Sequence, residues 1–287
     1  AIRLVHSLMT LNLTFTQIAA VLKYTRQGTE AKPTKDDPLY KLKKKPGYYW
    51  AEADIVERIY ATLGLASGHR HPLSYIMEAA DDIAYGLADI EDAVEKEVLS
   101  VDEVIQGIEK EYGEEKLEEE TLKDVTGRKR SLQDVLGGAK RSYNRNSIDS
   151  NNQFFISLRV SVHSILVAHA AERFVDNYDS VVAGNFNHPL LEDESDAHRL
   201  SAALQTLAGK YVFSHAEVEQ QELRGHTIIY GLLQIYSPLL FLSQQDFWRI
   251  AERDKHTCKA NPLCSRLFNK LSNKHVQAYK LAVEKYN

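Results

Sequence analysis

The sequence predicts an all-α protein. Apolar residues recur at helical spacing along almost the whole chain of 287 residues, which is the primary signal for amphipathic helices. Fourteen Gly and seven Pro are few for this length, whereas a large β-sandwich or barrel needs more turn residues. A hydrophobic content of 44% and a charged content of 26% are ordinary for a globular chain and exclude a disordered or collagen-like one. We therefore expect one compact multi-helix domain, or the larger part of one, over residues 1–287.

Capping residues and apolar spacing place the individual helices. Thr14 is suited to N-cap a helix over residues 15–24, and Gly64 ends a helix over residues 52–63. Ser74 is expected to cap a long helix that reaches about Leu99, and Gly184 ends another long helix. In chain order we expect helices over residues 1–11, 15–24, 52–63, 74–99, 101–112, 154–182, 194–210, 215–236, 243–256 and 264–285.

Two segments are expected to be long surface loops or insertions. Residues 25–50 are rich in Pro and Lys, and residues 113–150 pass from an acidic run to a basic one. The simplest interpretation of both charge runs is a solvated surface. The short stretch His69-Arg70-His71, next to Pro72, is likewise expected to be a surface turn rather than a metal site.

Charge and cysteine content restrict the partners and the compartment. A net charge of −5 and a pI near 6.1 give no global nucleic-acid signal, so contact with DNA would need a local patch. Two cysteines do not make a disulfide framework. No signal peptide opens the chain, and no apolar run is judged long enough to span a membrane. We expect a cytoplasmic protein without a membrane partner.

The first residues suggest that the chain starts inside a domain. Ala1, rather than Met, leads directly into an apolar pattern, whereas a natural start usually has a polar lead-in. We therefore expect an N-terminal truncation.

The long helix around residues 75–94 carries the most informative pattern. One apolar stripe is expected to face the core, formed by Ile76, Ala80, Ile83, Leu87, Ile90 and Val94. Asp81, Tyr85 and Asp89 are spaced by four and share a second face, roughly opposite, with the two aspartates about 12 Å apart along the axis. One carboxylate could hold a metal while the other binds a ligand a sugar's length away. An acidic, solvated helix face satisfies the same spacing.

The same segment carries a family resemblance. Residues 77–85 (MEAADDIAY) and 88–96 (ADIEDAVEK) resemble the bacterial deoxyguanosinetriphosphate triphosphohydrolases, which are HD-domain phosphohydrolases. Further segments resemble that family in the family's order: residues 2–8 (IRLVHSL), 22–26 (LKYTR), 44–49 (KKPGYY), 154–155 (FF) with 158–160 (LRV), 186–188 (FNH), 211–215 (YVFSH) and 265–268 (SRLF). The resemblance covers nearly the whole chain and implies an HD-type helical fold.

The resemblance implies hydrolysis of dGTP to deoxyguanosine and triphosphate with a divalent metal, Mg²⁺ or Mn²⁺. It makes Asp81 the last Asp of a His…His-Asp…Asp metal site. Tyr85 would then pack on the deoxyribose, and Asp89 would accept a hydrogen bond from the sugar 3′-hydroxyl.

The resemblance also assigns residues to the other parts of the nucleotide. Lys23 and Tyr24 would reach the triphosphate and the sugar, although a solvated lysine at a helix end is the simpler interpretation of Lys23 by itself. Phe213 and Glu222 would form the guanine pocket, with Ser214 as a helix cap. A core Phe and a surface Glu are the alternative for that pair.

The chain departs from the family pattern at the metal site. It contains no His-Asp dipeptide, so the other metal ligands and the catalytic acid or base are expected upstream of Ala1. This chain would then be the C-terminal portion of the enzyme, inactive by itself, with the missing N-terminal part as its partner. The resemblance further implies a homo-oligomer, a hexamer, and single-stranded DNA as an effector.

A second function class stays open. Residues 41–45, with Tyr48, Tyr49 and Trp50, combine cations and aromatic rings, and residues 128–145 add positive charge. This combination suits single-stranded nucleic acid, so the alternative is a non-catalytic helical protein that senses nucleotides or binds single-stranded DNA.

Overall fold

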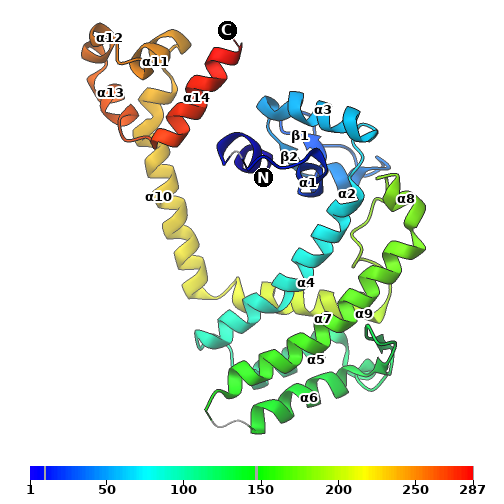
Figure 1. The fold of residues 1–287 in the computed structure, drawn as a ribbon. Coiled ribbons are helices and arrows are strands. Elements are labelled where there is room, and N and C mark those ends of the chain that lie inside the picture. Colours follow the sequence, from blue (N-terminus) through cyan, green and yellow to red (C-terminus); the bar gives the residue numbers. More distant parts are fainter. Residues whose placement is uncertain (10, 146–147, 287) are drawn as a thin grey trace. The chain divides into compact units, whose positions relative to one another are not determined.

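The computed structural model confirms the all-α prediction (Figure 1). It describes residues 1–9, 11–145 and 148–286; Thr10, in the first expected helix, and Asn146 and Ser147, in the second expected loop, lie outside the described residues. Two short ladders accompany the helices. β1 (Arg26–Gln27) pairs in parallel with β2 (Pro46–Tyr48), and β3 (Leu122–Lys123) pairs antiparallel with β4 (Lys129–Arg130).

The described chain divides into two compact units. The first contains residues 1–5 and 11–215, and the second contains residues 6–10 and 216–287. Each unit has buried apolar side chains of its own. A single domain over the whole chain stays a prediction.

Helices dominate the first unit. After the π-helical segment η1 (Arg3–Leu8), which crosses into the second unit, its helical elements are α1 (Phe15–Ala20), α2 (Tyr40–Lys43), η2 (Trp50–Glu52), α3 (Ala53–Leu63), α4 (Pro72–Glu95), α5 (Val101–Tyr112), η3 (Glu114–Lys116), α6 (Leu132–Arg145), α7 (Ser150–Asp176), α8 (Tyr178–Val182), α9 (Asp196–Leu207) and η4 (Ala208–Val212). The predicted caps at Thr14 and Gly64 are confirmed: Thr14 Oγ1 accepts from the Gln17 amide, and Gly64 has a φ of 67°. The main core lies where α4, α5, α6, α7 and α9 meet.

The long helix α4 starts differently from the prediction. His71, not Ser74, is its N-cap, and Pro72 occupies the first turn, where a missing N–H costs nothing. Ser74 is buried inside the helix, and its hydroxyl donates to the Leu22 carbonyl at 2.9 Å. The core stripe holds from Ile83 onward, but the first two turns bury Tyr75 and Ala79 and leave Ile76 and Ala80 exposed.

The second expected loop contains a helix. Within residues 113–150, α6 buries Leu132, Val135, Leu136 and Ala139 on one side, at helical spacing, and packs on α7. The prediction of a loop over this whole segment is wrong. The basic residues of α6 drew attention to its charge, although its apolar residues recur at helical spacing. Residues 25–50 match the prediction better, with only α2, two short strands and the first residue of η2.

Helix α7 (Ser150–Asp176) contains an apolar stretch that the prediction did not recognise as long enough to span a membrane. It is 27 residues long, with a mean hydropathy of 1.5 over its most apolar 18-residue window, so by length and composition it could cross a bilayer. Its side chains Phe154, Phe155, Leu158 and Val162 are buried in the core, which accounts for one apolar side of the helix. The expected helix over residues 154–182 is in fact α7 followed by the short α8, with Asn177 between them.

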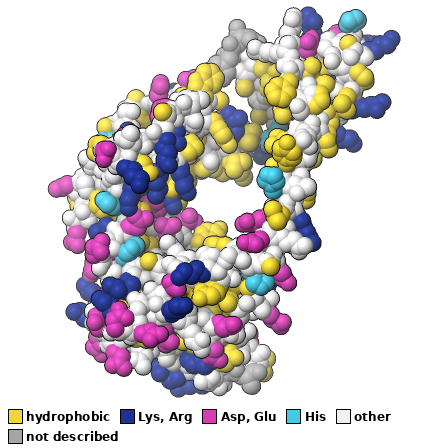
Figure 2. Space-filling view, turned by 180° about the vertical axis from the view of Figure 1, so that it is seen from behind, with side chains coloured by type: hydrophobic (Ala, Val, Ile, Leu, Met, Phe, Trp, Pro, Cys, Tyr) yellow, Lys and Arg dark blue, Asp and Glu magenta, His cyan; other side chains and the backbone are white. Residues whose placement is uncertain are grey.

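The second unit consists of α10 (Ala216–Leu240), α11 (Gln244–Ala251), α12 (Lys255–Ala260), α13 (Pro262–Phe268) and α14 (Asn273–Tyr286). The two last predicted helices are each interrupted. Arg253, with a φ of 59°, separates α11 from α12, and residues 269–272 separate α13 from α14. Only Leu239 of α10 is buried, and apolar side chains are exposed along this helix (Figure 2).

Candidate functional site

The predicted site face of α4 points away from the core. Asp81 and Tyr85 are exposed, Tyr85 to 63%, and Asp89 is half-buried, whereas Ile83, Leu87 and Ile90 are buried on the other side of the helix. Their separation from the core stripe agrees with the predicted spacing. The roles of these three residues in binding stay predictions.

The structure brings Lys23 to this helix. Lys23 Nζ lies 3.4 Å from Glu78 Oε1 and 3.6 Å from Asp82 Oδ1, so the cation joins two carboxylates one helical turn apart. The hydrogen bond between Ser74 and the Leu22 carbonyl holds the preceding residue against the start of α4. Lys23 is thus fixed beside Asp82, the immediate neighbour of Asp81.

Glu78 is anchored from its other side by Arg70. Arg70 and Glu78 are 2% and 4% exposed, and the Arg70 guanidinium donates to the Glu78 carboxylate. The same guanidinium lies 4.8 Å from the centre of the Tyr75 ring. The backbone of Arg70 donates to the Gly184 carbonyl at 2.8 Å, and a Cβ on Gly184 would lie 2.3 Å from the Arg70 carbonyl oxygen. Close approach of these two segments therefore requires glycine.

Sequence reasoning missed this pair. The expectation that His69-Arg70-His71 is a surface turn is wrong for Arg70, because Glu78, eight residues further on, compensates its buried charge. Glu78 and Asp82 were not predicted as partners of Lys23 either. Their spacing of four puts both carboxylates on one side of the helix, and this spacing could have indicated a shared cation.

The electrostatics keep Lys23 charged. Burial by itself would lower the pKa of Lys23, but attraction to Glu78 and Asp82 outweighs burial and raises that pKa. Burial also raises the pKa of Asp82, against the opposing effect of Lys23. A protonated lysine at this position suits a phosphate ligand.

Tyr24 is held by a tight backbone contact. A Cβ on Gly47 would lie 1.6 Å from the Tyr24 carbonyl oxygen, so only glycine allows strand β2 to pass this close. Lys45 Nζ lies 5.7 Å from the centre of the Tyr24 ring. A second cation is therefore near the Lys23–Tyr24 pair.

The two predicted guanine-pocket residues belong to different units. Phe213 is half exposed at the end of η4 in the first unit, and Glu222 is exposed on α10 in the second. The expectation that Ser214 caps the following helix is wrong: its hydroxyl donates to the Lys210 carbonyl, and α10 begins at Ala216. The pairing of Phe213 and Glu222 at one base stays a prediction.

The described residues do not build a metal site by themselves. Among them, no three His, Cys, Asp or Glu side chains are grouped so that they could hold an ion. Asp81 offers one exposed carboxylate, which is a suitable oxygen ligand for Mg²⁺ or Mn²⁺ but far short of a coordination sphere.

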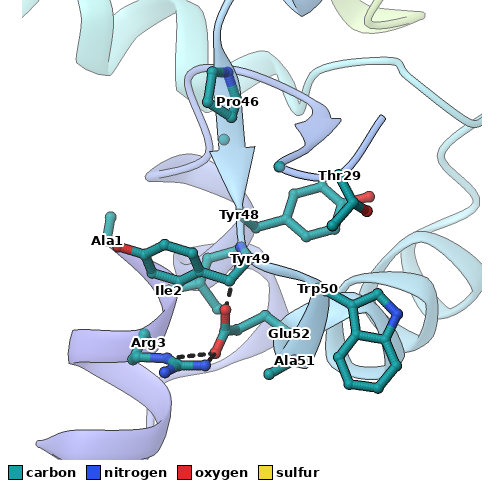
Figure 3. A pocket seen from close by; sticks show the side chains of 12 residues that line it. Ala1, Ile2, Arg3, Thr29, Pro46, Tyr48, Tyr49, Trp50, Ala51 and Glu52 are labelled. Carbon is teal, nitrogen blue, oxygen red and sulfur yellow. Dashed lines mark hydrogen bonds and ion pairs between the residues drawn. The ribbon is translucent and has the colours of Figure 1, made fainter. Parts of the chain in front are cut away.

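The aromatic residues near the N-terminus line a pocket of about 760 Å³ (Figure 3). Arg3 pairs with the buried Glu52 at 2.7 Å and stacks over the Tyr49 ring at 5.0 Å. Figure 3 shows the Trp50 indole pointing away from this pair. The lysines of residues 41–45 do not line this pocket, and Lys41 pairs with Glu192. The predicted combination of lysines and aromatic rings is therefore divided in the structure.

Comparisons with known proteins identify close relatives. Over 284 residues, the chain is 46% identical to a deoxyguanosinetriphosphate triphosphohydrolase of Serratia proteamaculans, covering 99% of this chain and 54% of the relative. A protein of the same name from Salmonella paratyphi A is 44% identical over 286 residues, again covering 99% of this chain and 54% of the relative. No family model matches the chain. The resemblance inferred from the sequence motifs is confirmed, and the chain spans about half the length of these relatives.

Proposed function

We propose that residues 1–287 are part of an enzyme that hydrolyses dGTP to deoxyguanosine and triphosphate. The names of the relatives support the reaction, and one structural observation supports the placement of the substrate. Lys23 lies within 3.6 Å of Asp82, at the start of the face that carries Asp81, Tyr85 and Asp89. Lys23 suits the triphosphate of a nucleotide, and the exposed Asp81 and half-buried Asp89 on the same face suit a metal ion and the sugar.

Lys23 binds the triphosphate in this proposal. The ammonium group exchanges part of its attraction to Glu78 and Asp82 for phosphate oxygens, which carry more charge. Glu78 remains neutralised by Arg70 when this happens, so the exchange leaves no buried charge unpaired. Tyr24, next in the chain, contacts the sugar.

Tyr85 and Asp89 select the deoxyribose. Their spacing of four puts Asp89 one turn beyond Tyr85 on the same side of α4. The Tyr85 ring packs where a 2′-hydroxyl would need room, and the Asp89 carboxylate accepts a hydrogen bond from the 3′-hydroxyl.

Phe213 and Glu222 recognise guanine. The Phe213 ring packs on the purine, and the Glu222 carboxylate accepts hydrogen bonds from N1–H and the 2-amino group. Adenine offers an acceptor at N1, so the same carboxylate disfavours dATP.

Asp81 is proposed as one ligand of a divalent ion, Mg²⁺ or Mn²⁺. Such an ion supplies activation of the attacking water and charge neutralisation on the phosphate. Because the described residues contain no group of three His, Cys, Asp or Glu side chains that could hold an ion, this proposal takes the other ligands from the part of the protein outside residues 1–287. It follows that residues 1–287 by themselves are inactive.

The test compares the whole protein with residues 1–287. Both are assayed for triphosphate and deoxyguanosine release from dGTP with Mg²⁺ or Mn²⁺. We expect activity only in the whole protein, and an at least tenfold loss of kcat/KM in Lys23→Gln. Lys32→Gln, at an exposed lysine between β1 and α2, is the control. An inactive whole protein, or full activity of Lys23→Gln, contradicts the proposal.

The homo-oligomer is part of the same proposal. Apolar side chains exposed on α10, such as Leu223, Ile228 and Leu232, support association between copies because large exposed apolar patches mark interfaces. Light scattering of the whole protein after gel filtration measures the number of copies. A monomer at micromolar concentration contradicts this part.

Single-stranded DNA binding is the second candidate. The exposed Tyr49 under the Arg3 guanidinium and the exposed Trp50 next to it in the chain favour it, because bases stack on exposed aromatic rings and a nearby cation attracts their phosphates. Fluorescence anisotropy with a labelled oligonucleotide tests it in residues 1–287. Trp50→Ala should weaken binding, and an oligonucleotide that does not bind the unsubstituted chain excludes this role for the fragment.

A further inference from the structure

An apolar groove lies between α4 and α7 in the first unit. It has a volume of about 360 Å³, and the side chains that line it are apolar. Ile76 and Ala80 of α4 form one side, and Val167, Ala171 and Val175 of α7 form the other, all five being exposed. The small side chains of Ala80 and Ala171 leave room for another element to approach both helices closely.

Both helices contribute apolar residues that the core of this unit leaves uncovered. Ile76 and Ala80 continue the apolar stripe of α4 by spacing, yet Ile76 is 47% exposed. On α7, Ile156, Val160, Val167 and Val175 form a second apolar stripe, on the side away from Leu158, Val162 and Ile165. A helix that is apolar on two sides is typical of one that is buried on both. The failed prediction for Ile76 and Ala80 therefore has a physical explanation: these apolar residues suit an element that packs on the outside of the two helices.

We propose that this groove is the docking site of a helix from the part of the protein that lies outside residues 1–287. The relatives supply the required length, since the chain spans 54% of each of them. The position is suitable, because Ala80 immediately precedes Asp81. Under the proposed function, the metal ion at Asp81 needs further ligands from outside residues 1–287. The docking itself does not depend on that function.

A second copy of the chain fits this groove less well. A stable complex between separate proteins buries about 800 Å² on each partner, whereas a groove of about 360 Å³ accepts only a few side chains. A covalently linked segment needs less area, because linkage makes docking an intramolecular event. The apolar side chains of one amphipathic helix match the groove in size and chemistry.

Cysteine accessibility tests the proposal. Ala80→Cys and Ala171→Cys are made in a background with Cys258 and Cys264 replaced by Ser, both in residues 1–287 and in the whole protein. Glu120→Cys, on an exposed acidic segment away from the groove, is the matched control. We expect maleimide labelling of positions 80 and 171 to be at least tenfold slower in the whole protein than in residues 1–287, with no such change at position 120.

Two outcomes of this experiment overturn the proposal. Equal labelling of positions 80 and 171 in both proteins shows that the groove is open in the whole protein. Protection that appears in residues 1–287 by themselves and grows with concentration makes a second copy the occupant.

A charge in the groove gives an independent measurement. Ala80→Glu should leave the Tm of residues 1–287 unchanged within about 1 °C, because the side chain is exposed there. In the whole protein it should lower the Tm by about 5 °C or more, since it buries an unpaired charge. A whole protein whose Tm is insensitive to Ala80→Glu contradicts docking at this place. Labelling of the cysteine variants decides the matter if the glutamate variant does not fold.

Discussion

The Arg70 guanidinium and the Glu78 carboxylate form an ion pair that is almost entirely buried. Lys23 joins the pair from the half-exposed side, at 3.4 Å from Glu78. The carboxylate thus serves a structural partner and a proposed substrate-binding partner together. Removal of the Glu78 carboxylate should therefore affect stability through Arg70 and activity through Lys23.

Glu78→Gln should destabilise residues 1–287 by about 3 kcal/mol, because it leaves the buried charge of Arg70 uncompensated. The measurement is urea unfolding followed by circular dichroism. Glu172→Gln is the control, since Glu172 pairs with Lys123 on the surface and such pairs contribute about 0–1 kcal/mol. Equal effects of the two substitutions would show that burial of the Arg70–Glu78 pair has no energetic consequence.

The sequence could predict this region only in part. The spacing of Ile83, Leu87, Ile90 and Val94 predicts the core side of α4 correctly, because that half of the helix packs on a single core. It fails at Ile76 because two apolar stripes overlap in the first turns, and only the tertiary structure decides which one is buried. Periodicity also cannot connect Lys23 with Glu78, because their contact depends on a hydrogen bond between residues 52 positions apart. The resemblance, not the pattern, identified Lys23.

Asp81→Ala should abolish dGTP hydrolysis by the whole protein and leave the fold intact. Asp81 is exposed in residues 1–287, so its removal costs no core packing. Activity is measured with saturating Mg²⁺ or Mn²⁺, and circular dichroism checks the fold. Asp92→Ala, at an exposed aspartate of the same helix, is the control. Turnover of Asp81→Ala at the level of the unsubstituted enzyme would exclude Asp81 from the metal site.

Asp89→Ala should raise KM for dGTP, at a cost of about 1–3 kcal/mol for the lost hydrogen bond to the 3′-hydroxyl. The decisive comparison is between dGTP and 2′,3′-dideoxy-GTP, which lacks that hydroxyl. The unsubstituted enzyme should prefer dGTP, and the variant should lose most of the preference. If both enzymes discriminate equally, Asp89 does not bind the 3′-hydroxyl.

His169 should make stability depend on pH between about 7 and 5. Burial lowers its pKa, and this outweighs the nearby Asp193 carboxylate, 3.4 Å away, which acts in the opposite direction. The unfolded chain takes up the proton near pH 6.5, before the folded protein does, so the contribution is complete above that pH and is lost as pH falls. The expected slope is at most about 1.4 kcal/mol per pH unit for this one group.

The test compares unfolding free energies at several pH values in three proteins. His169→Gln should flatten the fall between pH 7 and 5, whereas His256→Gln, at an exposed histidine, should not. Burial also lowers the pKa of His71, His163 and His188, so part of the slope should persist in His169→Gln. An unchanged slope would mean that His169 is protonated equally in the folded and unfolded states.

Glu222→Gln should reduce the preference of the whole protein for dGTP over dATP. A carboxylate that accepts from guanine N1–H and the 2-amino group faces an acceptor in adenine, which costs about 1–3 kcal/mol. The unsubstituted enzyme should therefore prefer dGTP by about tenfold to a hundredfold, and the variant should lose this mainly through lower activity on dGTP. The measurement is kcat/KM for both nucleotides. Glu219→Gln, at an exposed glutamate of the same helix, is the control. Because Glu222 is exposed in residues 1–287, the competing interpretation is a solvated surface residue, for which the two ratios would be the same.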